Sequence, residues 1–228
     1  MIPWHCLEVV ELPGLRSRME LWRRAEELSI RVNGEVLMNS KMRASEEAHA
    51  TLACDRLPRA GDSTAMPSPS VLVGGLGMGW TLAAALRSFG PSAEVLVAEL
   101  VPQVVQWNHG PLADLAGHPL ADPRVQVHEG DVGALMRAHR AKWDVILLDV
   151  DNGPEAFTYG DNDSLYGNEG LKVIHRALRP GGILSVWSAS GDAAFSRRLR
   201  ANGFEPEIHH VRARGTDGPR HTIWIATR

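Results

Sequence analysis

The sequence predicts an α/β protein with a mostly parallel seven-stranded sheet that ends in an antiparallel hairpin, plus a small N-terminal β-hairpin region. Three observations predict this fold class. Short aliphatic runs alternate with helical segments from residue 70 onward. The runs are continuously hydrophobic, which is typical of strands that helices cover on both faces. No helical segment separates the last two runs, so they must pair antiparallel.

The N-terminal region, residues 1–60, precedes this pattern. The stretch "ELSIRVNGEVLMNS" holds two strand-like runs joined by Asn33-Gly34, a dipeptide that suits a tight type I′ hairpin turn. A helix is predicted over "SEEAHATLACDRL", with Ser45 as its N-cap. The loop "LPRAGDSTAMPSPS" then leads into a second domain, which we expect over residues 61–228.

The second domain alternates strictly between strand and helix. Gly90 stops its first helix, and Pro180 with the following glycine pair closes its fourth. The strands are predicted over 71–75, 93–100, 124–131, 143–150, 183–189, 204–213 and 220–228, and the helices over 80–90, 102–117, 132–141, 168–182 and 193–203.

Composition excludes several function classes. The net charge of −3 and the lack of a basic stripe argue against a nucleic-acid partner. No apolar run is long enough to cross a bilayer, and no secretory signal is visible, so we expect no membrane partner. Two cysteines point to a reducing compartment, and we expect a cytoplasmic protein. No set of ligands has metal spacing, so we expect no metal.

The loop "VLVGGLGMGW" follows the first strand of this domain. Gly75, Gly77 and Gly79 lie at the carboxyl end of that strand, where open parallel sheets bind ligands. Their missing side chains allow the backbone to approach a ligand closely. A dinucleotide-binding loop would carry a third glycine where this chain has Trp80. The alternative interpretation is a glycine-rich turn kept only for packing.

Two acids end the next two strands. Glu99 can accept hydrogen bonds from both ribose hydroxyls, and its alternative role is a plain surface charge. Asp131 can accept from an adenine amino group, while the amide of Val132 reaches the ring nitrogen. The alternative role of Asp131 is an N-cap for the helix that follows. Together with the glycine loop, these residues favour a bound adenosine.

The order of several motifs resembles the spermidine synthase (polyamine aminopropyltransferase) family. These are "IRVNGEVLMNS", "VLVGGLGMG", "VLVAELVPQVV", "DPRVQVHEGD", "WDVILLDVDNGPE" and "SLYGNEGLKVIHRALRPGGIL". The similarity covers roughly residues 27–190. It implies a small N-terminal β domain on a Rossmann-like, class I S-adenosylmethionine (SAM)-dependent methyltransferase fold. It also implies aminopropyl transfer from decarboxylated SAM to a diamine, and a homodimer.

By position, Glu99 resembles the family's ribose-binding acid and Asp131 its adenine-binding acid. Asp149 resembles the acid that helps to deprotonate the attacking amine, and "DVDNGP" places Asp151 and Asn152 beside it as residues that orient the acceptor. The alternative for Asp149 is a residue that only ends its strand. Tyr159 lies in "FTYGDNDSLY", residues 157–166, which we expect to form part of a lid over the acceptor.

Two departures from the family pattern bear on the reaction. Met78 stands where the family has an aspartate that binds the amine of the aminopropyl group, and the loss of that anion favours intact SAM, which carries its own carboxylate. The family's tyrosine-histidine-glutamate cluster is replaced by "ASEEAHA", in which Glu47 could still hold the acceptor or lie on a solvated helix face with Glu46. Trp80 could wall the site or contact a cation, or simply pack the first helix.

The sequence therefore favours a SAM-dependent transferase that moves a methyl group to a small polar or amine acceptor, with Asp149 as the proton-accepting group. The first alternative is aminopropyl transfer from decarboxylated SAM to a polyamine. The second is a catalytically idle nucleoside-binding or scaffold module. Trp107 and Asn108 are expected to be core residues rather than ligands.

Overall fold

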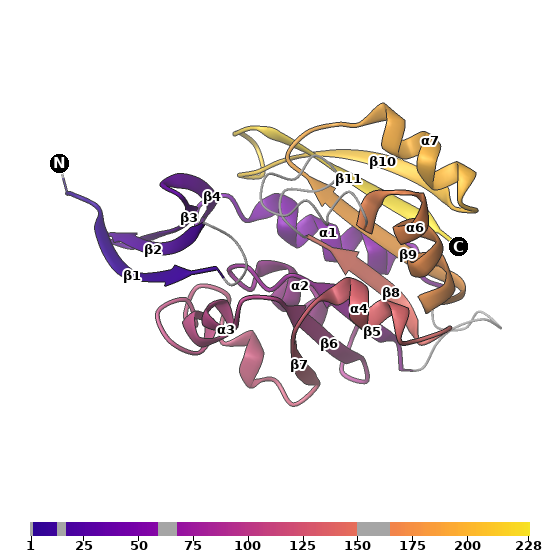
Figure 1. Cartoon of the computed structure of the whole chain (residues 1–228), viewed down its shortest axis with the longest axis horizontal. Helices are drawn as coiled ribbons and strands as arrows, with labels where there is room; N and C mark the ends of the chain where they lie inside the picture. Colours follow the sequence, from indigo (N-terminus) through magenta and orange to yellow (C-terminus); the bar gives the residue numbers. More distant parts are fainter. Residues whose placement is uncertain (1, 13–16, 59–67, 150–164) are drawn as a thin grey trace.

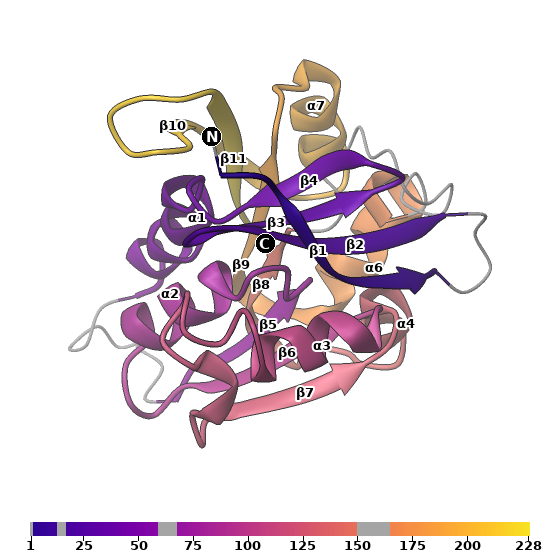
Figure 2. The same cartoon turned by 90° about the vertical axis from the view of Figure 1, so that its left-hand side faces the viewer.

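The computed structural model describes residues 2–12, 17–58, 68–149 and 165–228. Its strands form two sheets, of four and seven strands (Figure 1). Seen from the side that carries the N-terminus, the four-stranded sheet lies in front of the larger one (Figure 2). The mixed α/β fold class is confirmed.

The four-stranded sheet is an antiparallel meander in the order β1-β2-β3-β4. Its strands are β1 (His5–Glu11), β2 (Arg18–Arg24), β3 (Glu27–Val32) and β4 (Glu35–Asn39). The β3–β4 hairpin was predicted, and its turn residues Asn33 and Gly34 both have positive φ, 51° and 86°. Neither β1 nor β2 was predicted from the sequence.

The seven-stranded sheet has the order β10-β11-β9-β8-β5-β6-β7. Its strands are β5 (Ser70–Gly74), β6 (Glu94–Glu99), β7 (Val125–Glu129), β8 (Trp143–Leu148), β9 (Leu178–Ser188), β10 (Glu205–Arg212) and β11 (Arg220–Thr227). The strands β5 to β9 pair in parallel, whereas β11 pairs antiparallel with both β9 and β10. The predicted parallel sheet with a terminal antiparallel hairpin is confirmed.

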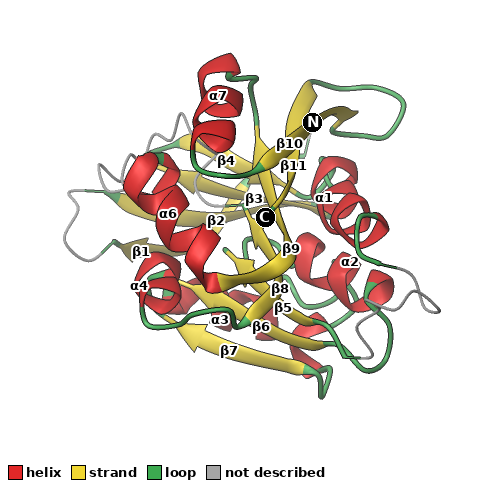
Figure 3. Cartoon of the chain, turned by 90° about the vertical axis from the view of Figure 1, so that its right-hand side faces the viewer, coloured by secondary structure: helices red, strands yellow, loops and turns green. Residues whose placement is uncertain are grey.

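Helices cover both faces of this sheet (Figure 3). They are α1 (Ala44–Asp55), α2 (Trp80–Ser88), α3 (Pro102–His109), α4 (Val132–Arg137), α6 (Asn168–Ala177), α7 (Ala193–Ala201) and the 3₁₀ turn η1 (Pro119–Ala121). One buried apolar cluster lies between α1, α2, α3 and the sheet, and the other lies under α4, α6 and α7. Within the described ranges, no helix has the length and apolar composition needed to cross a membrane.

All five predicted helices of the second domain end earlier than predicted, and the two largest differences are in α3 and α6. The helix α3 stops at His109, because Gly110 follows and the chain turns. The helix α6 stops at Ala177, three residues before Pro180, because Leu178 already begins β9. Neither difference moves the carboxyl ends of the strands, which carry the candidate site.

The helix α1 belongs to the packing of the larger sheet. It contacts α2 and the strands β8 to β11. Its N-cap is Arg43, so the prediction of Ser45 as the cap is wrong. The Ser45 hydroxyl is fully buried and lies 2.8 Å from Nδ1 of His221. The predicted domain boundary, between residues 60 and 61, lies outside the described residues.

Candidate functional site

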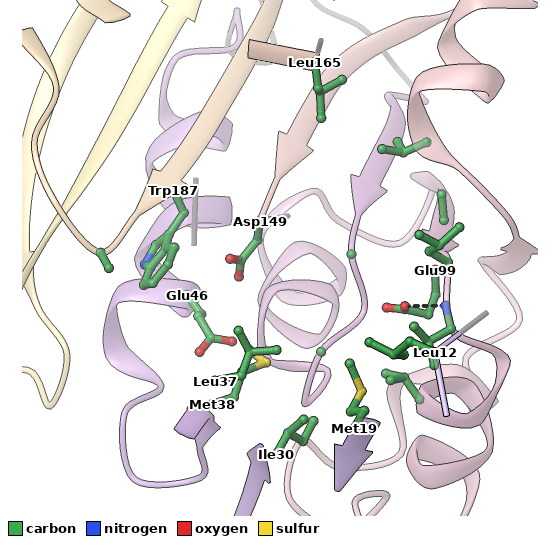
Figure 4. Close-up of a pocket in the computed structure, with 18 of the residues that line it drawn as sticks. Leu12, Met19, Ile30, Leu37, Met38, Glu46, Glu99, Asp149, Leu165 and Trp187 are labelled. Carbon is green, nitrogen blue, oxygen red and sulfur yellow. Dashed lines mark hydrogen bonds between the residues drawn. The ribbon is translucent and has the colours of Figure 1, made fainter. Parts of the chain in front are cut away.

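A pocket of about 690 Å³ lies between the four-stranded sheet and the carboxyl ends of β5, β6, β7 and β8. Because the strands β5 to β8 are parallel, their carboxyl ends meet at one edge, as expected for a ligand site. Figure 4 shows two groups of acids in this pocket, with Glu46 and Asp149 in one part and Glu99 in another. Apolar side chains of the four-stranded sheet lie below them, namely Met19, Ile30, Leu37 and Met38.

The glycine loop lies against this pocket at two positions with positive φ, where a Cβ would meet backbone at Gly75 and the flexible end of Met38 at Gly77. Gly75 has a φ of +90°, and a Cβ there would lie 2.6 Å from the carbonyl oxygen of Asp149. Gly77 has a φ of +52°, and a Cβ there would lie 2.8 Å from the sulfur of Met38. Both glycines line the pocket. The loop therefore brings bare backbone to the ligand space.

Asn108 holds the loop from behind. Its side-chain amide donates to the carbonyl oxygens of Gly77 and Val104 at 2.8 and 2.9 Å. Its neighbour Trp107 is fully buried and donates through Nε1 to Glu8 at 2.8 Å. Both residues lie in the interior and support the site without lining it, as expected.

Three loop residues predicted as ligand contacts lie elsewhere. The side chain of Met78 is fully buried in the core, and Gly79 is the N-cap of α2, where a Cβ would lie 2.9 Å from Oδ1 of Asn108. Trp80 is buried at the start of α2, with the guanidinium of Arg43 5.3 Å from its ring centroid. None of the three lines the pocket. The packing alternative for Trp80 matches this placement, because the first turn of α2 directs the ring inward.

Glu99 lies at the end of β6 and is only 8% exposed. Its Oε2 accepts a hydrogen bond from the amide of Leu76 and its Oε1 accepts one from the amide of Val101, both at 2.9 Å. These bonds fix the carboxylate between the glycine loop and the start of α3. The carboxylate lines the pocket, where the hydroxyl of a sugar is the kind of donor from which it can accept a hydrogen bond.

Asp131 takes its alternative role as an N-cap and also lines the pocket. It is the N-cap of α4 and accepts a hydrogen bond from the amide of Ala134 at 2.5 Å. It also forms an ion pair with Arg137 at 3.1 Å. With Val132, it lines the pocket beside Glu99. A helix N-terminus at this point presents further N–H donors to a ligand.

The acid from α1 that enters the pocket is Glu46. It is 7% exposed and lies near Asp149, which directly follows β8. Burial raises the pKa of Glu46 well above its usual value, and the charges of Asp149 and Glu47 raise it further. Two acidic side chains that line the same pocket and interact electrostatically form a site that suits a cation.

Glu47 takes its alternative placement on the outer face of α1 instead of lining the pocket as an acceptor-binding acid. It forms an ion pair with Arg87 of α2 at 3.2 Å and lies outside the pocket lining. The helical phase explains why Glu46 enters the pocket and Glu47 does not, because consecutive residues of a helix point about 100° apart. The buried residues of α1 are Ser45, Glu46, His49, Ala50 and Ala53, and Glu47 is not among them.

The sequence analysis did not assign Trp187 and His221 to the site. Trp187 from β9 and His221 from β11 both line the pocket near Glu46. Their ring centroids are 4.7 Å apart with an interplanar angle of 74°. No local sequence signal could have found this pair, because β11 pairs with β9 only in the folded sheet.

Three further predicted residues, Asp151, Asn152 and Tyr159, lie outside the described residues. Within residues 2–12, 17–58, 68–149 and 165–228, no cluster of three His, Cys, Asp or Glu side chains could hold a metal ion. The described site therefore has four parts. They are the glycine loop, the strand-end acids Glu99 and Asp131, the carboxyl pair of Glu46 and Asp149, and the ring pair of Trp187 and His221.

The chain resembles curated polyamine aminopropyltransferases in sequence. It is 33% identical over 121 residues to the enzyme of Nitrosomonas europaea, which covers 53% of this chain and 35% of that protein. It is 30% identical over 165 residues to polyamine aminopropyltransferase 2 of Pseudomonas aeruginosa, which covers 64% of this chain and 42% of that protein. The matches thus span less than half of the relatives' own lengths. No protein-family model matches the sequence.

Solved structures share its fold. A spermidine synthase in complex with the transition-state analogue AdoDATO superposes with a TM-score of 0.75 at 17% identity, covering 97% of this chain and 73% of that one. A 1,6-didemethyltoxoflavin-N1-methyltransferase of Burkholderia thailandensis, with bound S-adenosylhomocysteine, gives a TM-score of 0.55 at 20% identity, covering 82% and 79%. The chain is therefore similar to polyamine aminopropyltransferases over part of its length, and it shares the Rossmann-like methyltransferase fold of these solved structures.

Proposed function

We propose that this chain is a transferase that moves an aminopropyl group from decarboxylated SAM to an amine acceptor. The observation that carries the proposal is the pair of carboxyls, Glu46 and Asp149, in the same pocket as the nucleoside-type acids Glu99 and Asp131. The named activity of the curated relatives supports aminopropyl transfer over the methyl transfer that the sequence favoured.

The nucleoside part of the donor fits the strand ends. Gly75 and Gly77 offer bare backbone, Glu99 offers two fixed acceptor oxygens for the ribose, and Asp131 with the amide of Val132 offers an acceptor and a donor for the purine edge. The neighbours with bound AdoDATO and S-adenosylhomocysteine support a SAM-type nucleoside.

The charge of the pocket suits a decarboxylated donor. Aminopropyl and acceptor amines are both cations near neutral pH, and Glu46 and Asp149 offset that charge. Intact SAM would add a carboxylate. Among the described lining residues, the basic side chains are His221 and Arg137, and Arg137 already pairs with Asp131. Among the described lining residues from β2 to β4, the one donor side chain is that of Asn39, and its amide already donates to Glu27 at 2.7 Å.

The residues of the chain then align the displacement. The donor, when bound, supplies a sulfonium whose bond to the aminopropyl carbon breaks as the acceptor nitrogen forms its new bond, and the electron pair stays on sulfur. Glu46 and Asp149 hold the amines beside each other, and Met38 with Leu37 excludes water from the line of attack. The amine must lose a proton before it can attack.

A second candidate function is methyl transfer from intact SAM. It is favoured by Met78, which leaves the glycine loop without the anion that an aminopropyl donor would use. Met78 is fully buried and does not line the pocket. Methionine in place of the family's aspartate at this position therefore changes the charge of the pocket less than Glu46 and Asp149 do. We therefore rank this function second.

Mass spectrometry of the product tests the proposal. The protein is incubated with 1,4-diaminobutane and either decarboxylated SAM or SAM. We expect an aminopropylated product with the first donor, which Asp149→Asn abolishes while donor binding is kept. A methylated product would establish the second candidate instead. Donor binding without any product would support the idle module. A homodimer and a cytoplasmic location stay predictions.

A further inference from the structure

The sequence analysis made Asp149 the proton-accepting group, but a carboxyl pair that binds an ammonium group also holds that group in its charged form. A carboxylate beside an ammonium group stabilises the charged form and raises the pKa of the amine. The protonated amine has no lone pair with which to attack. Capture by Glu46 and Asp149 therefore makes the following proton loss harder, and a neutral base within the same pocket would complete the site.

His221 is the one histidine among the described residues that line the pocket. It projects from β11 and is 8% exposed. Its Nδ1 lies 2.8 Å from the hydroxyl of Ser45, which is the residue directly before Glu46 on α1. The imidazole is thus anchored one residue away from the acid that would hold the amine.

The ring is held in one orientation. The ring of Trp187 meets His221 in a T-shaped contact from β9, and Ser45 fixes the Nδ1 side. The Nε2 atom makes no hydrogen bond to any described residue, and it is not among the fully buried polar atoms that lack a partner. One ring nitrogen is therefore committed to the protein, and the other keeps accessible surface in a side chain that lines the pocket.

We propose that His221 is the proton acceptor for the acceptor amine, with Ser45 as its positioning residue. This inference rests on the proposed function. In the step, Nε2 takes one proton from the acceptor ammonium and leaves its electron pair on nitrogen. That pair then forms the new N–C bond as the C–S bond of the sulfonium breaks, and sulfur keeps the bonding electrons. The Nδ1–H of the resulting imidazolium donates to the oxygen of Ser45.

The electrostatic surroundings agree with this role. Burial lowers the pKa of His221, so the ring is neutral and able to accept a proton near pH 7. The titratable groups that neighbouring elements bring to the same pocket are Glu46 from α1 and Asp149 from the end of β8. The strand β9 brings Trp187, and β10 pairs Val211 with His221.

The first test is the variant His221→Gln, assayed with decarboxylated SAM and 1,4-diaminobutane. We expect kcat to fall by about 100-fold, the usual contribution of a positioned base, while the Kd of the donor stays unchanged. The acidic limb of the wild-type pH–rate profile should be lost. The matched control is His210→Gln on the same hairpin, which lies outside the pocket lining and should keep the wild-type rate and profile.

The second test separates proton removal from a structural role. An aminooxy analogue of 1,4-diaminobutane presents a terminal –O–NH2 group that is neutral at the assay pH. We expect wild type and His221→Gln to use this acceptor at similar rates, because no proton has to be removed before attack. A loss of equal size with both acceptors, or no loss with either, would overturn the proposal.

Failure of the proposed function gives a different result. If wild type transfers no group from decarboxylated SAM or SAM to any of these acceptors, the transferase proposal falls, and the role of His221 falls with it. If wild type is active and His221→Gln retains its rate and pH profile, the transferase stands and only the role of His221 is wrong. The variant Ser45→Ala should lower kcat several-fold and leave the KM for the acceptor unchanged.

Discussion

The side-chain amide of Asn108, at the end of α3, donates to the carbonyl oxygen of Gly77 at 2.8 Å and so ties the second helix of the larger domain to the glycine loop. The same amide also bonds the carbonyl oxygen of Val104. One buried side chain thereby fixes the backbone on which the donor is proposed to lie.

We therefore expect Asn108→Ala to destabilise the protein by about 1–3 kcal/mol, because buried backbone oxygens lose their donor. The affinity for decarboxylated SAM should fall as well. Thermal unfolding and isothermal titration calorimetry measure the two effects. As a control, Asn202→Ala removes a similar bond to a helix carbonyl far from the pocket and should leave the affinity unchanged. Unchanged affinity in Asn108→Ala would contradict the role of the loop.

A second prediction separates crowding from backbone strain at glycine. Gly75 and Gly90 both have positive φ, but a Cβ at Gly75 would meet the Asp149 carbonyl at 2.6 Å, and one at Gly90 would meet nothing within 4 Å. Gly90→Ala should cost about 1–2 kcal/mol of strain and keep donor binding. Gly75→Ala should cost more and lose donor binding. Chemical denaturation and calorimetry compare them, and equal losses in the two variants would argue against a crowded loop.

The raised pKa of Glu46 makes a third prediction, on stability against pH. Since the folded protein binds this proton more tightly than the unfolded chain does, the carboxyl contributes most stability below pH 4.5, and that contribution is lost as pH rises through the raised pKa. Glu46→Gln should remove this loss, which urea unfolding between pH 4.5 and 8 detects. Glu47→Gln, on the ion-paired outer face, is the matched control. A wild-type decline that persists in Glu46→Gln would show that another group causes it.

His49 predicts the opposite slope. It is fully buried on α1, neither ring nitrogen has a hydrogen-bond partner within the described part of the chain, and burial lowers its pKa to about 4. The unfolded chain therefore binds more protons between pH 4 and 6.5, and stability falls by about 3 kcal/mol as pH drops through that window. His49→Leu should abolish this fall, whereas His5→Leu at an exposed position should keep it. A fall of equal size in His49→Leu would rule out His49 as its source.

Much of the fold follows from local sequence. Three features can be recognised from a few neighbouring residues each. They are the alternation of strand and helix after residue 70, the Asn33-Gly34 turn, and the two strand-like runs joined by the short loop 214–219. The strand β1 cannot be recognised in this way, because six of its seven residues are exposed and no period-2 pattern marks a buried face. A strand that is held mainly by its backbone partner leaves little trace in side-chain pattern.

The site divides in the same way. Gly75, Gly77, Glu99 and Asp131 were predictable, because topology alone brings the ends of parallel strands together. The choice between Glu46 and Glu47 depends on the phase of a helix, which a one-residue error in its start reverses. The pairing of Ser45 with His221 joins residues 176 positions apart and depends on how α1 lies on the sheet. Such contacts come from tertiary packing and have no local signature.

The central claim is that Glu99 holds the nucleoside of a SAM-type donor, and the most direct test is the Kd of decarboxylated SAM for wild type and Glu99→Ala, measured by calorimetry. Glu94→Ala, at the exposed far end of the same strand, is the control and should bind as wild type does. The account predicts that Glu99→Ala weakens binding by about 1–3 kcal/mol, roughly 5- to 150-fold. A dissociation constant equal to that of wild type would contradict it.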